Sequence, residues 1–124
     1  MNKLESLKID FKKAIDKLEE VLKKEKNEIY RDSAIKRFEF TFDLSWKLIK
    51  TYLEDQFDVL CNSPKSCFRE AYSQELIKYN DQWIKMVDWR NLSSHTYSEE
   101  FANDLYKELP KFLKLFKDLN KKIQ

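Results

Sequence analysis

The sequence predicts an all-helical fold, an up-down bundle of about five helices with three long and two shorter members. The 124 residues contain no glycine and only two prolines. This composition excludes glycine-rich phosphate loops, Asn-Gly hairpins and glycine-cornered β-sandwiches. Apolar residues recur in alternating steps of three and four, which is the period of an amphipathic helix. A chain of this length is one domain, residues 1–124.

The first part of the chain contains two long predicted helices. Apolar spacing predicts the first from about residue 3 to about residue 26. The second begins near residues 31–33, and we expect Phe42 and Trp46 of this helix to be buried. Its apolar residues cover more than one face, and Phe40 lies outside the main stripe. Such a helix needs more than one neighbour, either within the chain or from a second copy.

Capping signals divide the rest of the chain into three more helices. A Ser-Pro pair starts a short helix over about residues 64–77, and another opens near residues 80–81. Ser98, followed by two glutamates, caps the last helix. Pro110 lies inside that helix, where we expect a kink or a restart. The lysines from residue 111 to residue 122 fit the solvated face of the same helix.

Charge and cysteine content restrict the function classes. Twenty-four basic and 22 acidic residues leave a net charge of +2, too balanced for non-specific nucleic-acid binding. Cys61 and Cys67 form neither a CxxC pair nor a disulfide framework, and His95 is the single histidine. No metal site and no cofactor are therefore predicted. The N-terminus lacks an apolar signal core, and no stretch approaches a membrane span, so we expect a reduced, cytoplasmic protein with no membrane partner.

The densest polar motif is WRNLSSHTY, residues 89–97. On a continuous helix Arg90 and His95 would lie about 140° apart, so either the helix ends near residues 92–95 or another element or subunit completes the site. An arginine suits phosphate binding and a histidine suits proton transfer, a pair that could cleave RNA without a metal. The alternative is structural: both side chains cap carbonyls and pair with nearby acids.

A second polar feature is the pair Glu39 and Asp43, one helical turn apart on the second helix. Two like charges on one strip are unfavourable in isolation, so a basic group such as Arg90 or Lys50 is expected to meet them. The alternative is a solvated acidic strip neutralised by the lysines of the same helix.

Three segments together resemble one family. RFEFTFDLSWK, SPKSCFREAY and WRNLSSHTY are similar to the HEPN superfamily, and in particular to its nucleotidyltransferase substrate-binding branch. The resemblance implies a bundle of about five helices that forms a two-fold homodimer. It also implies a minimal nucleotidyltransferase, encoded beside it, that joins the dimer in a hetero-oligomer.

The same resemblance implies roles for individual residues. In many HEPN proteins an R-x4–6-H motif at the dimer interface is a metal-independent ribonuclease site; here it maps onto Arg90 and His95, with polar Asn91 beside the arginine. In related toxin–antitoxin pairs the transferase adenylylates the tyrosine of an H-x-Y extension, which maps onto Tyr97.

Three functions are compatible with the sequence. The leading prediction is a nucleotide- or substrate-binding partner subunit of a minimal nucleotidyltransferase, a homodimer within a hetero-oligomer. The alternative is a ribonuclease toxin that this transferase neutralises, with RNA as its substrate. A plain dimerisation module is the third, and the intact motif argues against it. The candidate site comprises catalytic, modified and supporting acidic residues: Arg90, Asn91 and His95; Tyr97; Glu39 and Asp43.

Overall fold

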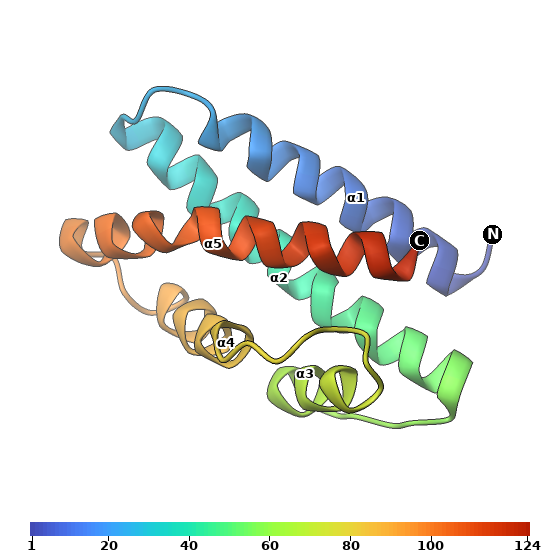
Figure 1. Ribbon diagram of the computed structural model, residues 1–124. Helices are drawn as coiled ribbons and strands as arrows, with labels where there is room; N and C mark the ends of the chain where they lie inside the picture. Colours follow the sequence, from blue (N-terminus) through green and yellow to red (C-terminus); the bar gives the residue numbers. More distant parts are fainter.

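The computed structural model describes residues 1–124 as five helices joined by short connections (Figure 1). The helices are α1 (Lys3–Leu22), α2 (Glu28–Phe57), α3 (Pro64–Ser73), α4 (Gln82–Ser93) and α5 (Glu99–Ile123). The all-helical prediction, with three long and two shorter helices, is confirmed. None of the five is long and apolar enough to cross a membrane.

The three long helices pack together, and the two short ones cover the side of α2 and α5 away from α1 (Figure 1). Buried aromatic rings connect these layers. Phe116 of α5 contacts Phe11 of α1 with ring centroids 6.0 Å apart and Trp83 of α4 at 6.1 Å. Phe38 of α2 stacks on Phe112 of α5 at 5.5 Å. These aromatic contacts fix the start of α4 against the long helices.

The chain ends two helices without glycine. Asp58 after α2 and Glu75 after α3 take left-handed conformations, with φ of 54° and 61°, although glycine is usual at this position. After α3, the Leu76 amide donates to the Ala71 carbonyl at 2.8 Å, and Leu76 is buried. This hydrogen-bond pattern turns the chain sharply and fixes how the 74–81 loop leaves α3.

Several predicted boundaries move by a few residues. Helix α1 ends at Leu22 rather than near residue 26, and α3 ends at Ser73 rather than near residue 77. Helix α2 begins before residue 31, because the Asn27 side chain caps it by accepting from the Tyr30 amide at 2.7 Å. Helix α5 runs without a restart through Pro110, which lies on the exposed face where its ring displaces no packed neighbour.

The sequence predicts that Phe42 and Trp46 are both buried; the structure confirms this for Phe42 and shows that it is wrong for Trp46. Phe42 is 2% exposed, whereas Trp46 is half-buried at the margin of the core. Phe40 is 56% exposed, as expected for a residue outside the main stripe. The expectation of two unpaired cysteines is wrong: Cys61 and Cys67 form a disulfide. The turn into α3 brings their Cα atoms to 5.1 Å, within bonding reach.

Candidate functional site

Arg90, in the last turn of α4, meets the acidic pair of α2. Its Nη2 lies 3.2 Å from Asp43 Oδ2 and its Nε 3.3 Å from Asp43 Oδ1, while its Nη1 donates to Glu39 Oε2 at 3.2 Å. Nη1 also donates to the Ser94 hydroxyl at 2.9 Å. The expectation that a basic group meets Glu39 and Asp43 agrees with this geometry, and Arg90 is that group. We call these three residues the Arg90 cluster.

The Arg90 cluster is half-buried. The side chains of Glu39, Arg90 and Asp43 are 12%, 23% and 37% exposed. Burial on its own would lower the pKa of Arg90, but the hydrogen bond to Asp43 and the charges of both carboxylates outweigh it and raise that pKa above its ordinary value. Arg90 therefore stays charged between the two acids, and Lys36 Nζ lies 3.9 Å from Oε1 of Glu39 as a second cation.

Helix α4 ends between Arg90 and His95, which is one of the two alternatives that the sequence left open. The helix stops at Ser93, and the His95 amide donates to the Leu92 carbonyl at 3.0 Å. The Ser93 hydroxyl donates to Glu39 Oε2 at 2.6 Å, which connects the end of the helix to the Arg90 cluster. Ser93 and Ser94 are polar residues of a type that favours helix ends.

The other predicted site residues lie outside the Arg90 cluster. Asn91 and His95 are exposed, and their side chains make no hydrogen bond within the chain. Tyr97 is 91% exposed. It lies at a shallow pocket of about 230 Å³ that Glu39 and Ser93 also line. The chain thus brings Arg90, Glu39 and Asp43 together and leaves His95 and Tyr97 exposed.

Sequence reasoning missed a second arginine cluster beside the same segment. Arg31, 5% exposed, donates from Nη1 to Glu99 Oε2 at 2.6 Å and from Nη2 to Glu99 Oε1 at 3.2 Å. It also contacts Asp32 and Asn103. The hydrogen bond to Glu99 raises the pKa of Arg31 further above its ordinary range. We call this the Arg31 cluster; it joins the start of α2 to the start of α5.

A signal for the Arg31 cluster was present in the sequence. A basic residue in the first turns of a helix faces the positive end of the helix dipole, so Arg31 needs an acidic partner. The glutamates after Ser98 indicate only a favourable first turn, and nothing in their spacing shows which helix they meet.

Family comparison identifies the fold and its relatives. Residues 8–124 match the family described as "Nucleotidyltransferase substrate binding protein like", which is nearly the whole chain. The chain belongs to this family, a branch of the HEPN superfamily. The resemblance that the three sequence segments carry is therefore confirmed.

Two relatives of this family member are informative. The "Probable ribonuclease HepT" of Haemophilus influenzae is 36% identical over 84 residues, which are 64% of this chain and 58% of that protein. The match thus spans less than two thirds of the relative's length. A crystal structure of a Thermus thermophilus protein has a TM-score of 0.85 at 32% identity, covering 92% of this chain and 98% of that one. The second match confirms the HEPN-like helical fold.

Proposed function

We propose that this protein is the nucleotide- or substrate-binding partner subunit of a minimal nucleotidyltransferase, and that it works as a two-fold homodimer within a hetero-oligomer. The observation that carries the proposal is that the Arg90 guanidinium is already hydrogen-bonded within the chain. Each guanidinium nitrogen already donates to Asp43, Glu39 or Ser94. To hold a scissile phosphate, Arg90 would have to release those partners next to two carboxylates that repel the phosphate.

Exposed apolar side chains beside the cluster support assembly. Leu92 is 51% exposed and Tyr97 is 91% exposed, at the end of α4 that also carries Arg90. Large exposed apolar residues near a polar cluster are typical of interaction surfaces. We therefore expect the 90–97 regions of two subunits to approach each other, with the transferase bound at the same end of the bundle.

The experiment is co-expression with the product of a neighbouring reading frame that carries a GSxxxGxxxxxSDxD-type transferase motif. We expect a stable complex in size-exclusion chromatography with light scattering, and a dimer by sedimentation when the chain is alone. Leu92→Asp should weaken assembly. The control Leu60→Asp, at a leucine that is 71% exposed elsewhere on the surface, should not. A clean monomer at micromolar concentration that binds no transferase would contradict the proposal.

A second function is favoured by the similarity to the "Probable ribonuclease HepT". In that reaction the His95 imidazole takes the proton of a ribose 2′-OH, whose oxygen attacks the adjacent phosphorus. The 5′-oxygen leaves with the proton that the imidazolium returns, and a 2′,3′-cyclic phosphate remains. Arg90 stabilises the charge of the phosphorane. Exposed His95 is accessible to RNA, and an adenylyl group on Tyr97 would block that access.

RNA cleavage in the presence of a chelator separates the two functions. For the ribonuclease, His95→Ala should lower the rate by at least about 100-fold, and products should carry 2′,3′-cyclic phosphate. Adenylylation should silence the wild type but not Tyr97→Phe. For the partner subunit, the purified dimer cleaves no RNA.

A further inference from the structure

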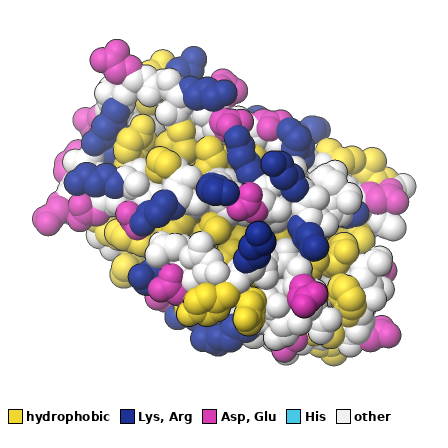
Figure 2. Space-filling model, in the orientation of Figure 1, with side chains coloured by type: hydrophobic (Ala, Val, Ile, Leu, Met, Phe, Trp, Pro, Cys, Tyr) yellow, Lys and Arg dark blue, Asp and Glu magenta, His cyan; other side chains and the backbone are white.

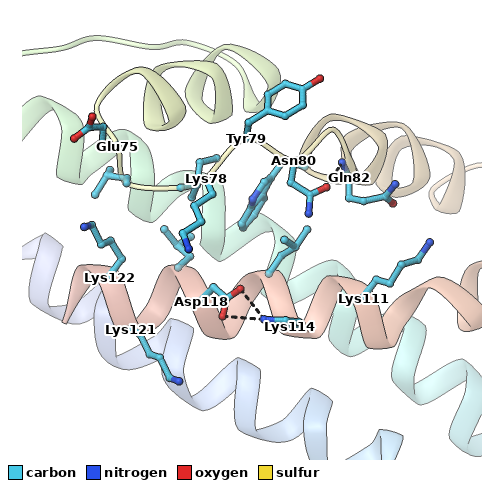
Figure 3. Close-up of a pocket in the computed structure, with 15 residues that line it drawn as sticks. Glu75, Lys78, Tyr79, Asn80, Gln82, Lys111, Lys114, Asp118, Lys121 and Lys122 are labelled. Carbon is cyan, nitrogen blue, oxygen red and sulfur yellow. Dashed lines mark hydrogen bonds and ion pairs between the residues drawn. The ribbon is translucent and has the colours of Figure 1, made fainter.

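A cavity of about 650 Å³ lies at the other end of α4, between the 74–81 loop and the second half of α5 (Figure 3). Its size falls within the range of small-molecule sites. The loop is anchored on both sides, because Leu76 and Trp83 are 5% and 3% exposed. The cavity is therefore part of the folded structure and needs no rearrangement to form.

Positive charge dominates this cavity. Two acidic residues, Glu75 and Asp118, line it against five lysines: Lys78, Lys111, Lys114, Lys121 and Lys122. Figure 2 shows Lys and Arg side chains gathered across the middle of this face. The sequence indicates only a solvated helix face at residues 111–122, but the structure places Lys78 of the loop opposite that face.

Three of these lysines make no ion pair in the chain, but the Lys121 side chain points away from the loop in Figure 3, which leaves two for a ligand. Lys111 pairs with Glu108 and Lys114 with Asp118, whereas Lys78 and Lys122 make no ion pair in the chain. In Figure 3 the Lys78 side chain reaches from the loop toward α5, between Lys122 and Asp118. The last-turn position of Lys122 also suits the negative end of the helix dipole, but Lys78 belongs to no helix.

The rest of the lining combines two neutral polar residues, Asn80 and Gln82, with Tyr79 and five apolar residues. Buried Leu76, Trp83 and Leu119 form part of the wall, and the half-buried Ile77 and Leu115 complete it. A ligand that fills the cavity must therefore combine several negative charges with a less polar body. An inorganic anion satisfies only the lysines, and an uncharged ring satisfies only the apolar wall.

We propose that this cavity binds a nucleoside polyphosphate, with the phosphates at Lys78 and Lys122 and the base against Ile77 and Leu115. Lysine binds phosphate oxygens as a point charge, and five lysines against two acids leave the lining positive, which favours a ligand with several phosphates. The inference extends the proposed substrate-binding role, on which it rests, to a surface away from the Arg90 cluster. It gives the bound substrate a chemical class.

The test is calorimetric titration of the isolated chain with ATP, tripolyphosphate and adenosine at fixed salt. We expect ATP to bind at least about tenfold more tightly than either fragment. The double variant Lys78→Gln/Lys122→Gln should weaken ATP binding about tenfold, the effect of losing two exposed ion pairs. The control Lys24→Gln/Lys107→Gln removes the same charge from exposed residues outside the cavity and should change affinity less than about twofold.

Three results would overturn the inference. Equal losses in the two double variants would show non-specific charge attraction, and equal binding of ATP and tripolyphosphate would show that the apolar wall takes no part. Tighter binding of single-stranded RNA through the same lysines would make the cavity an RNA surface. Since the titration uses the chain alone, failure here leaves the co-expression result for the transferase partnership unaffected.

Discussion

Two arginine clusters flank the 94–98 segment, and they differ in which side chain is more buried, the arginine or its acidic partner. In the Arg31 cluster the arginine side chain is 6% exposed and its partner Glu99 is 69% exposed. In the Arg90 cluster the most buried member is an acid: Glu39 is 12% exposed and Arg90 is 23% exposed. The first cluster therefore buries a cation that joins two helices. The second holds buried negative charge, and its arginine keeps that charge compensated.

Removing Arg31 should give the largest effect. Arg31→Ala deletes hydrogen bonds to three side chains and the packing of a buried stem, so we expect about 2–3 kcal/mol less free energy of unfolding in urea. Arg69→Ala is the matched control, because Arg69 is exposed and makes no ion pair. A loss at Arg31 no larger than at Arg69 would show that the cluster does not stabilise the fold.

Removing Arg90 should lower the free energy of unfolding by less, and a second substitution in the Arg90 cluster should restore most of it. Arg90→Met leaves half-buried Glu39 with only the 3.9 Å contact to exposed Lys36, which we expect to cost about 1–2 kcal/mol in urea unfolding. Adding Glu39→Gln removes the carboxylate charge and keeps an acceptor for the Ser93 hydroxyl, so most of the loss should return. If the double variant is less stable than Arg90→Met, Glu39 is not the charge that Arg90 compensates.

Acid titration should separate the clusters further. The hydrogen bond from Arg31 lowers the pKa of Glu99 below its ordinary value of 4.5. The stabilisation from this pair is thus fully present above pH 4.5 and disappears as pH falls through the lowered pKa of the folded state. The stability advantage of wild type over Glu99→Gln should shrink over that interval in urea unfolding. An advantage that stays constant down to about pH 3 would contradict the assignment.

The smallest effect is expected between the clusters. His95 and Tyr97 are exposed and unpaired, so His95→Ala and Tyr97→Phe should change the unfolding free energy by less than about 0.5 kcal/mol. Thermal melts of both variants check this. A substantial loss at His95 would support the structural role that the sequence also allowed for this residue.

Much of this architecture follows from local signals. The period of apolar residues identifies the first two helices, and capping signals divide the rest of the chain into the other three. The like-charge pair Glu39 and Asp43 also predicts that a basic side chain lies beside it, because two carboxylates one helical turn apart repel each other unless a cation compensates them.

The features that sequence missed depend on tertiary placement. The Arg31–Glu99 contact requires the start of α5 to lie against the start of α2, and the lysine cavity requires the 74–81 loop to cross α5. The disulfide depends on how tightly the chain turns into α3. No single-helix pattern carries this information.

If Arg90 is held by Glu39 and Asp43 in a partner subunit of a nucleotidyltransferase, as we propose, it is not free to bind a scissile phosphate. The most direct measurement is RNA cleavage by the purified protein in the presence of a chelator, with and without the co-expressed transferase. We expect a stable complex with the transferase and no cleavage in either sample. Cleavage by the protein alone that leaves 2′,3′-cyclic phosphate and is lost in His95→Ala would contradict the proposal.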